Sequence, residues 1–421
     1  MTDNASSTVK LTRRIEFWLL IALILFVPLL EAPKNVVWLC YLLLWLFNRV
    51  GQRKKGEGWD LWDGLIAIWV FSGFIGGAFA GLHFNEWREP LDVVRYGLLL
   101  WAVKRSGYTQ TDLRRLVWMV AASTLIALAF GLWCRYVAHT TSALQLNSVG
   151  HVNHSAIYLV ISFGVTLAYT FAYWREMRCG WQIGWLLINL LFVAGILLSA
   201  SRAAVGMIPL LSLGLALVWC RRSPRPLLAV VIAGILIGVF AICTRIEVVI
   251  KHEYYTVETY NVLNSRGQFW ESAITAWRKY PLFGVGMGNF REIDASHVKQ
   301  WSEELGEPFD SSRYLQIAHA HSLYFNTLAE RGLFGATVLA AIMLTWLFGL
   351  IHRMPFAKSD NLTWLLWGGS LSAWLTTVVI GTVNTTLHHE HGMLSGLLLG
   401  AWLASRRYEI KSDEKSSPMH G

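Results

Sequence analysis

Apolar runs long enough to cross a lipid bilayer recur along most of the 421-residue chain. A transmembrane helix needs about 20 apolar residues to span the ~30 Å hydrocarbon core. Charged residues make up 15% of the chain, against about 25% in ordinary soluble domains. The pattern predicts an all-α polytopic integral membrane protein with one transmembrane domain over residues 1–421. It excludes a disordered chain, a coiled coil and a disulfide scaffold, and it disfavours a soluble enzyme.

We expect about twelve transmembrane helices. They lie roughly at 15–31, 35–49, 61–82, 91–103, 113–135, 155–174, 182–200, 203–220, 226–244, 323–351, 362–383 and 391–405. The first follows a basic stretch, as a signal peptide would. It ends in Glu31-Ala32-Pro33-Lys34 without a small-residue cleavage pattern. We therefore interpret it as an uncleaved first span.

The positions of the cations predict the orientation of these spans. If the N-terminus is cytoplasmic, most of the 36 Lys and Arg residues fall in cytoplasmic segments. The short outward loops and their flanks then hold only Lys34, Arg88, Arg95, Arg135 and Arg202. Cytoplasmic loops of membrane proteins carry such an excess of Lys and Arg. Both termini, including a tail at 406–421, are therefore predicted to be cytoplasmic. The net charge of +9 thus reflects topology, and no nucleic-acid partner is expected.

The outward segment 245–322, between the ninth and tenth spans, is the only long hydrophilic stretch, and loops of this length are usually functional. Its apolar residues predict a helix over 264–280, capped by Asn264 or Ser265. Arg266 would then lie in the first turn, where the helix dipole also favours an anion. An interfacial helix with a solvated Arg266 remains an equal alternative. The following Gly284-Val285-Gly286-Met287-Gly288 is interpreted as a flexible turn beside the site, because no strand precedes it.

Arg202 lies in the tight outward turn Ser201-Arg202-Ala203-Ala204. An arginine at the edge of the hydrocarbon is costly unless paired, and it often marks a ligand path. The alternative is that its side chain extends to the lipid headgroups. We favour a functional role, because this turn faces outward, where short loops carry few cations.

Histidines gather in two outward places. His319 and His321 open the tenth span, where an imidazole suits a general base or a helix cap. In the last outward loop, His388, His389, Glu390 and His391 resemble a metal site, but the outward aspartates are isolated in sequence. We interpret these four residues as lining a polar cavity, and we predict no metal site. A disulfide between Cys134 and Cys243 is left open.

A family resemblance rests on three motifs. His321-Ser322, nine residues, and then Gly332-Leu333-Phe334-Gly335 resembles the His-[Asn/Ser/Gln]-x9-Gly-x-x-Gly pattern of bacterial lipopolysaccharide O-antigen ligases. The Ser-Arg-Ala-Ala turn at 201–204 and the stretch from Ser265 to Gly288 are similar to the same superfamily. O-antigen polymerases and O-linked oligosaccharyltransferases share this region. The resemblance covers about 185–350.

The resemblance implies a GT-C-like glycosyltransferase in the bacterial inner membrane, with its active site facing the periplasm and 245–322 forming part of it. The donor would be O-antigen on undecaprenyl pyrophosphate, and the acceptor the outer-core sugar of lipid A–core oligosaccharide. Both substrates would reach the site through the surrounding membrane lipids. His321, Arg202 and Arg266 are the residues carried over as catalytic. Arg202 and Arg266 would also bind substrate, together with Arg95 and His319.

The chemistry of this reaction agrees with these residue types. A lipid pyrophosphate is already activated, so neither ATP nor another cofactor is expected. Arginines offer permanently charged, bidentate donors for the leaving diphosphate. His321, kept neutral by nearby arginines, would deprotonate the acceptor hydroxyl. We therefore expect metal-independent transfer with inversion, because no motif places a nucleophilic carboxylate near the site.

Three alternatives remain. An O-antigen polymerase or an O-linked protein oligosaccharyltransferase would use a similar donor and a different acceptor. The His-Ser-x9-Gly-x-x-Gly form favours the ligase. A lipid-linked glycan transporter is more distant, because such a protein usually has charged residues within its spans or paired broken helices.

Overall fold

The computed structural model describes residues 2–51, 58–141, 143–199, 201–243, 262–311, 314 and 318–416. All regular secondary structure in these ranges is helical, which confirms the predicted fold class. The long helices are α1 (Thr2–Phe26), α2 (Glu31–Gly51), α3 (Leu61–Ala78), α4 (Pro90–Lys104), α5 (Gln110–Tyr136), α6 (Val152–Tyr173), α7 (Cys179–Leu198), α8 (Arg202–Trp219), α9 (Arg225–Cys243), α13 (Leu323–His352), α14 (Asn361–Ile380) and α15 (His389–Ser416).

Each of the twelve expected spans coincides with one of these helices. Within the described ranges, seven are long and apolar enough to cross a membrane: α3, α5, α6, α7, α8, α13 and α14. The protein is therefore a polytopic membrane protein. The full number of twelve crossings stays a prediction, because the other helices are shorter in their apolar part or more polar.

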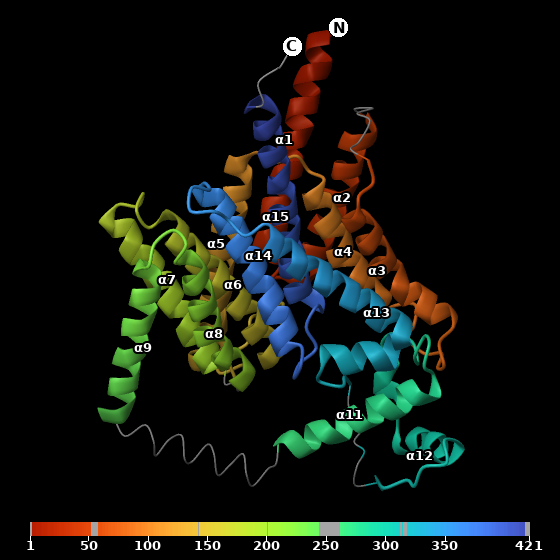
Figure 1. Cartoon of the computed structure of the whole chain (residues 1–421). Coiled ribbons are helices and arrows are strands. Elements are labelled where there is room, and N and C mark those ends of the chain that lie inside the picture. Colours follow the sequence, from red (N-terminus) through yellow and green to blue (C-terminus); the bar gives the residue numbers. More distant parts are fainter. Residues whose placement is uncertain are drawn as a thin grey trace.

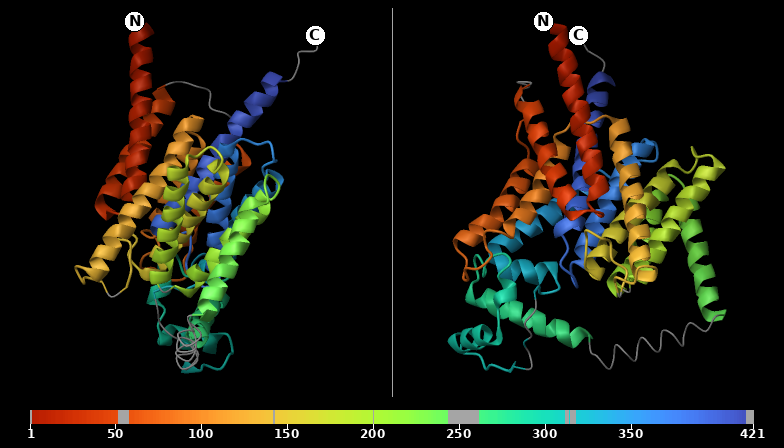
Figure 2. Two further views of the ribbon diagram at one scale, coloured as in Figure 1. Left: turned by 90° about the vertical axis from the view of Figure 1, so that its left-hand side faces the viewer. Right: turned by 180° about the vertical axis from the view of Figure 1, so that it is seen from behind.

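The start of α1 and the end of α15 lie at the same end of the helix bundle (Figure 1). The helices of the long hydrophilic segment, α11 (Val262–Lys279) and α12 (Ala295–Glu304), lie at the opposite end, and the views in Figure 2 agree. This arrangement fits an even number of crossings. The distribution of Lys and Arg predicts that the end with α11 and α12 is periplasmic.

Small residues let the helices at the centre pack closely. Helix α6 packs on α14, and α4 packs on α15. A Cβ atom at Gly368 of α14 would lie 2.8 Å from the Cβ of Ala168, and one at Gly400 of α15 would lie 2.9 Å from the carbonyl oxygen of Leu100. Without a hydrophobic driving force in lipid, such close backbone approach is a main source of helix association.

A buried ion pair joins an early helix of the chain, α2, to the last one, α15. Lys34 of α2 contacts Glu390 of α15, and both side chains are almost fully buried. Lys34 also contacts Glu31, one turn earlier in the same helix and largely exposed. A buried charge requires such a partner, so this contact fixes how α2 meets α15.

Two predictions concern residues that lie partly outside the described ranges. The segment 245–322, expected to form part of the active site, is one, because residues 244–261, 312–313 and 315–317 are not described. The side chain of Cys243 also lies outside the described ranges, so a disulfide with Cys134 stays untested.

Candidate active site

His321 lies in the turn that leads into α13. Its backbone is left-handed, with a φ of 47°, a conformation that costs about 1–3 kcal/mol for a non-glycine residue. Ser322 caps the helix by accepting a hydrogen bond from the N–H of Phe325 at 3.4 Å. The N–H of Leu323 donates to the carbonyl of Gly381 at 2.8 Å. The turn is thus fastened to the end of α14.

A buried hydrogen-bond network extends from this turn. The Asn326 side-chain oxygen accepts from the N–H of Ala320 at 3.1 Å, and its Nδ2 donates to Glu330 at 2.9 Å. The other Glu330 carboxylate oxygen accepts from the N–H of Gly288 at 2.9 Å. The backbone before His321 is therefore linked through two side chains to the glycine run.

Helix α13 is kinked at Gly332, which has φ 59° and ψ −159°. The N–H of Leu333 donates to the carbonyl of Pro281 at 2.8 Å, in place of a bond within the helix. The N–H of Val285 likewise donates to the carbonyl of Ala329 at 2.9 Å. The first glycine of the Gly-x-x-Gly motif is thus where α13 bends to receive the chain that follows α11.

The glycine run Gly284–Gly288 is a turn beside the site, as expected, but the interpretation as a flexible turn is wrong. All five residues are buried, and the three glycines have φ values of 70°, 95° and 77°. The N–H groups of Gly286 and Gly288 are already bonded to the Glu330 backbone and side chain. The turn is a rigid connection between α11 and the kink in α13.

Replacement of Gly332 by alanine is expected to destabilise the protein. The new Cβ would lie 2.4 Å from the backbone of Leu282, at a left-handed φ. The conformational strain alone is about 1–3 kcal/mol. The midpoint of thermal unfolding of the purified protein in detergent should fall by several degrees. Gly206→Ala on α8, where nothing lies within 4 Å, is the control and should keep or slightly raise the midpoint. Equal midpoints for Gly332→Ala and wild type would contradict the strained kink.

Helix α11 brings Arg266 to the side of His321. The Phe269 ring lies 5.5 Å from the His321 ring, measured between centroids, and Trp270 stacks on Phe325 of α13 at 5.1 Å. Arg266 precedes Phe269 by three residues, so both lie on one helix face. The helix begins at Val262, earlier than expected. Arg266 therefore lies in the second turn, and the expectation that it lies in the first is wrong.

Arg202 is the first residue of α8, directly after the short turn from α7, and its side chain is exposed. Burial lowers the pKa of Arg266, and the positive charge of Arg202 lowers it further. Burial also lowers the pKa of His321, as does Arg266, while a hydrogen bond with Asn384 raises it. Arg202 thus lies near enough to Arg266, and Arg266 near enough to His321, for the charge of the first to lower the pKa of the second in each pair. These effects favour a neutral His321 imidazole at neutral pH. The catalytic roles of the three residues stay predictions.

The two further predicted binding residues lie elsewhere. Arg95 donates from Nη1 to the Asp92 carboxylate at 2.9 Å, so its charge is compensated locally. His319 lines a small cavity, together with Glu89, Asp92 and Arg331 among others. Burial lowers the pKa of His319 to about 4, with Arg291 as the next cause. His319 thus lies in this cavity and Arg95 is paired with Asp92. Substrate binding by either residue stays a prediction.

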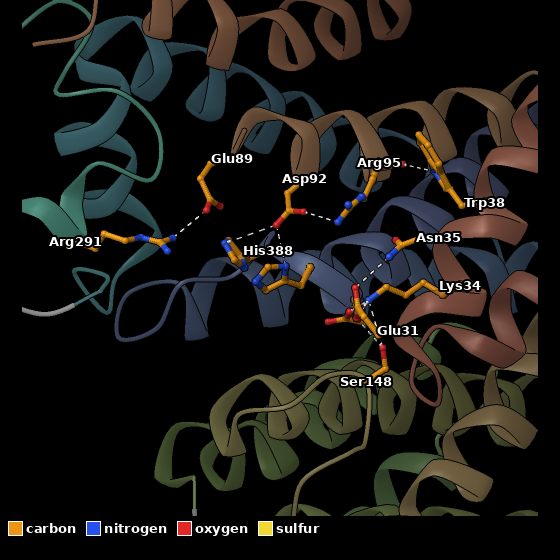
Figure 3. A network of polar contacts seen from close by, with 12 residues as sticks. Glu31, Lys34, Asn35, Trp38, Glu89, Asp92, Arg95, Ser148, Arg291 and His388 are labelled. Atoms are coloured by element: carbon orange, nitrogen blue, oxygen red, sulfur yellow. Dashed lines mark hydrogen bonds and ion pairs between the residues drawn. The ribbon is translucent and has the colours of Figure 1, made fainter. Parts of the chain in front are cut away.

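Asp92 is the residue whose neighbours the sequence did not predict. It is isolated in sequence, but in the folded chain its carboxylate lies beside His388 and His389, as Figure 3 shows for the labelled His388. His388 lines the cavity, as expected. Almost 300 positions separate α4 from this turn, so no local pattern in the sequence signals the contact.

A comparison with protein families covers the same part of the chain. Residues 187–340 match the O-antigen ligase family model. The matched segment runs from within α7 into α13 and includes Arg202, Arg266 and His321. The match confirms the resemblance drawn from the motifs and supports a glycosyltransferase activity of the O-antigen ligase type. No curated protein matches the chain.

Proposed function

We propose that the protein is an O-antigen ligase of the bacterial inner membrane. It transfers O-antigen from undecaprenyl pyrophosphate to the outer-core sugar of lipid A–core on the periplasmic side, and so completes lipopolysaccharide. The observation that carries the proposal is the match of residues 187–340 to the family, a segment that contains Arg202, Arg266 and His321. The pairwise effects of Arg202 on Arg266 and of Arg266 on His321 support a shared site.

The two arginines bind the diphosphate of the donor. Arg202 lowers the pKa of Arg266, which means that the two positive charges repel each other. A bound diphosphate offsets this repulsion, and the guanidinium groups donate bidentate hydrogen bonds to its oxygens. Because negative charge on the diphosphate grows as the glycosidic bond breaks, the same contacts stabilise the transition state more than the ground state.

His321 acts on the acceptor. Its lowered pKa keeps the imidazole neutral, so it can accept the proton of the acceptor hydroxyl. The hydroxyl oxygen then forms a bond to the anomeric carbon of the glycan, the bond from this carbon to the diphosphate oxygen breaks, and undecaprenyl pyrophosphate leaves. Direct displacement of this kind inverts the anomeric centre. The two guanidinium groups neutralise the leaving group, so transfer needs no metal ion.

The helices at this end of the bundle suit two lipid-linked substrates. Helix α11 packs against the beginning of α13 through Trp270 and Phe325, and α12 lies beside α11. Both helices lie at the predicted periplasmic end of the bundle, on the side of α13 (Figure 1). Donor and acceptor then reach His321 from the outer leaflet of the inner membrane, beside these two helices.

The proposal is tested by expressing the chain in a strain that lacks its own O-antigen ligase and separating the lipopolysaccharide on a gel. We expect a restored ladder of lipid A–core that carries O-antigen. If longer glycans accumulate on the lipid carrier instead, the chain is a polymerase. Glycan attached to protein would identify an oligosaccharyltransferase. NMR of the new linkage should show inversion relative to the donor, and a retained configuration would reject direct displacement.

A further inference from the structure

A second cluster of polar side chains lies at the turn that joins α14 to α15. It contains Asp92 of α4 and the consecutive residues His388 and His389 (Figure 3). Asp92 Oδ2 lies 2.8 Å from His389 Nδ1 and 4.0 Å from His388 Nε2. One potential ligand atom from each residue lies within 4.8 Å of the other two.

The strained backbone of this turn brings the side chains of His388 and His389 close together. Leu387 and His389 both have left-handed φ values, 55° and 44°, each costing about 1–3 kcal/mol. The rings of His388 and His389 are 3.6 Å apart between centroids, at an angle of 84°. Consecutive side chains usually diverge, so this conformation places both imidazoles beside one carboxylate.

Within the described part of the chain, not every polar atom of the cluster has a hydrogen-bond partner. Asp92 Oδ2 is buried, and its partner is His389 Nδ1 at 2.8 Å. His388 Nδ1 is buried and has no hydrogen bond there. The other Asp92 oxygen accepts from Arg95 at 2.9 Å, which orients the carboxylate. Buried polar atoms of this kind need a partner, and Oδ2 lies next to the imidazoles.

The charges around the cluster allow a cation. Five carboxylates lie in this region, against four cationic side chains: Glu31, Glu89, Asp92, Glu330 and Glu390 against Lys34, Arg95, Arg291 and Arg331. Lys34, Arg95 and Arg291 are each already in contact with a carboxylate. Asp92 and His388 line the same cavity as His319, whose ring lies 5.4 Å from that of His388.

Two imidazoles and one carboxylate form a ligand set that zinc prefers. Zn²⁺ binds His nitrogen at about 2.0–2.1 Å and carboxylate oxygen at about 2.0–2.2 Å. Tetrahedral ligands at these lengths are therefore roughly 3.3 Å apart. The separations of 2.8 Å and 4.0 Å lie on either side of this value, so small side-chain rotations complete the geometry.

We propose that Asp92, His388 and His389 bind a divalent transition-metal ion of the zinc class, which fastens the beginning of α4 to the turn between α14 and α15. The ion has a structural role, since the arginines and the histidine proposed for catalysis are other residues. This proposal departs from the sequence-based prediction of no metal site, because the sequence did not show Asp92 beside the histidines. It does not rest on the proposed function.

The test measures metal in the full-length protein purified in detergent. After incubation with zinc and removal of free metal, wild type should retain about one zinc per chain by elemental analysis. Asp92→Asn and His389→Gln should each lose at least tenfold in zinc affinity. His297→Gln is the matched control, because His297 and Asp294 also lie 2.8 Å apart but have no third ligand in the described residues. It should bind zinc as wild type does.

Cobalt provides a measurement that needs no variant to fold. Bound to wild type, Co²⁺ should give the visible absorption of a tetrahedral site, and zinc should displace it. Absence of stoichiometric zinc and of this absorption would overturn the proposal, as would equal zinc binding by Asp92→Asn. Glycan transfer by chelated wild type separates the two proposals. If transfer needs zinc, metal-independent catalysis fails while the metal site stands.

Discussion

Glutamine in place of Arg266 is expected to slow glycan transfer by about 10²–10³-fold, the usual effect of removing one donor to a developing negative charge. Arg202→Gln should have an effect of the same size, because the proposed mechanism assigns both guanidinium groups to one diphosphate. The rate constant at saturating lipid-linked donor is the quantity to measure, with purified protein in lipid vesicles. Arg266→Lys should retain more activity than the glutamine variant, since it keeps the charge and loses only the bidentate geometry.

Arg278→Gln is the matched control for this prediction. Arg278 lies on the same helix, is exposed, and contacts Glu307 at 2.6 Å. Its replacement should leave the rate of transfer unchanged. A rate for Arg266→Gln within about threefold of wild type would remove Arg266 from the mechanism. The same result for both Arg202→Gln and Arg266→Gln would overturn the proposed diphosphate site.

Alanine in place of His321 is expected to reduce the rate constant by about 10²–10⁴-fold, the contribution of a general base. Donor binding should change little, because the imidazole acts on the acceptor hydroxyl. The same vesicle assay measures both quantities. His297→Ala, in the same hydrophilic segment, serves as the control and should transfer glycan at the wild-type rate. A His321→Ala variant with wild-type activity would exclude a general base at this position.

The pH dependence separates a general base from a residue that only supports the turn. His321 must be neutral to accept a proton, and burial and Arg266 lower its pKa. Activity should therefore persist as the pH falls through 6.5, the ordinary value for histidine, and be lost only below it. Removal of the Arg266 charge raises the pKa of His321. In Arg266→Gln, the residual activity should thus be lost at a higher pH than in wild type.

The helices could be predicted from the sequence because each apolar run must satisfy its own backbone hydrogen bonds in lipid. The run at 182–200 coincides with α7, for example, and the run at 362–383 with α14. The helix predicted over 264–280 is α11, which runs from Val262 to Lys279. Its contacts with α13 join distant parts of the chain, so the residues of α11 alone do not predict them.

The candidate site was partly predictable, because Arg202, Arg266 and His321 lie in short motifs that can be recognised from the sequence alone. The kink at Gly332 is a backbone conformation and has no signal in hydropathy. The contact between Asp92 and His389 joins distant segments, and so does the pair formed by His154 and His391 at 2.7 Å. The resemblance implies a substrate-binding role for Arg95, and the structure adds its pairing with Asp92, which the sequence does not show.

The buried contact of Lys34 with Glu390 has a consequence for biogenesis. Synthesis proceeds from the N-terminus, so α2 enters the membrane long before α15 exists. A lysine without a partner at that stage would be costly. Glu31, one turn away and largely exposed, accompanies Lys34 during this interval. Arrival of the last helix then supplies the permanent counter-charge, so cotranslational assembly ends by closing the first helical hairpin against the final one.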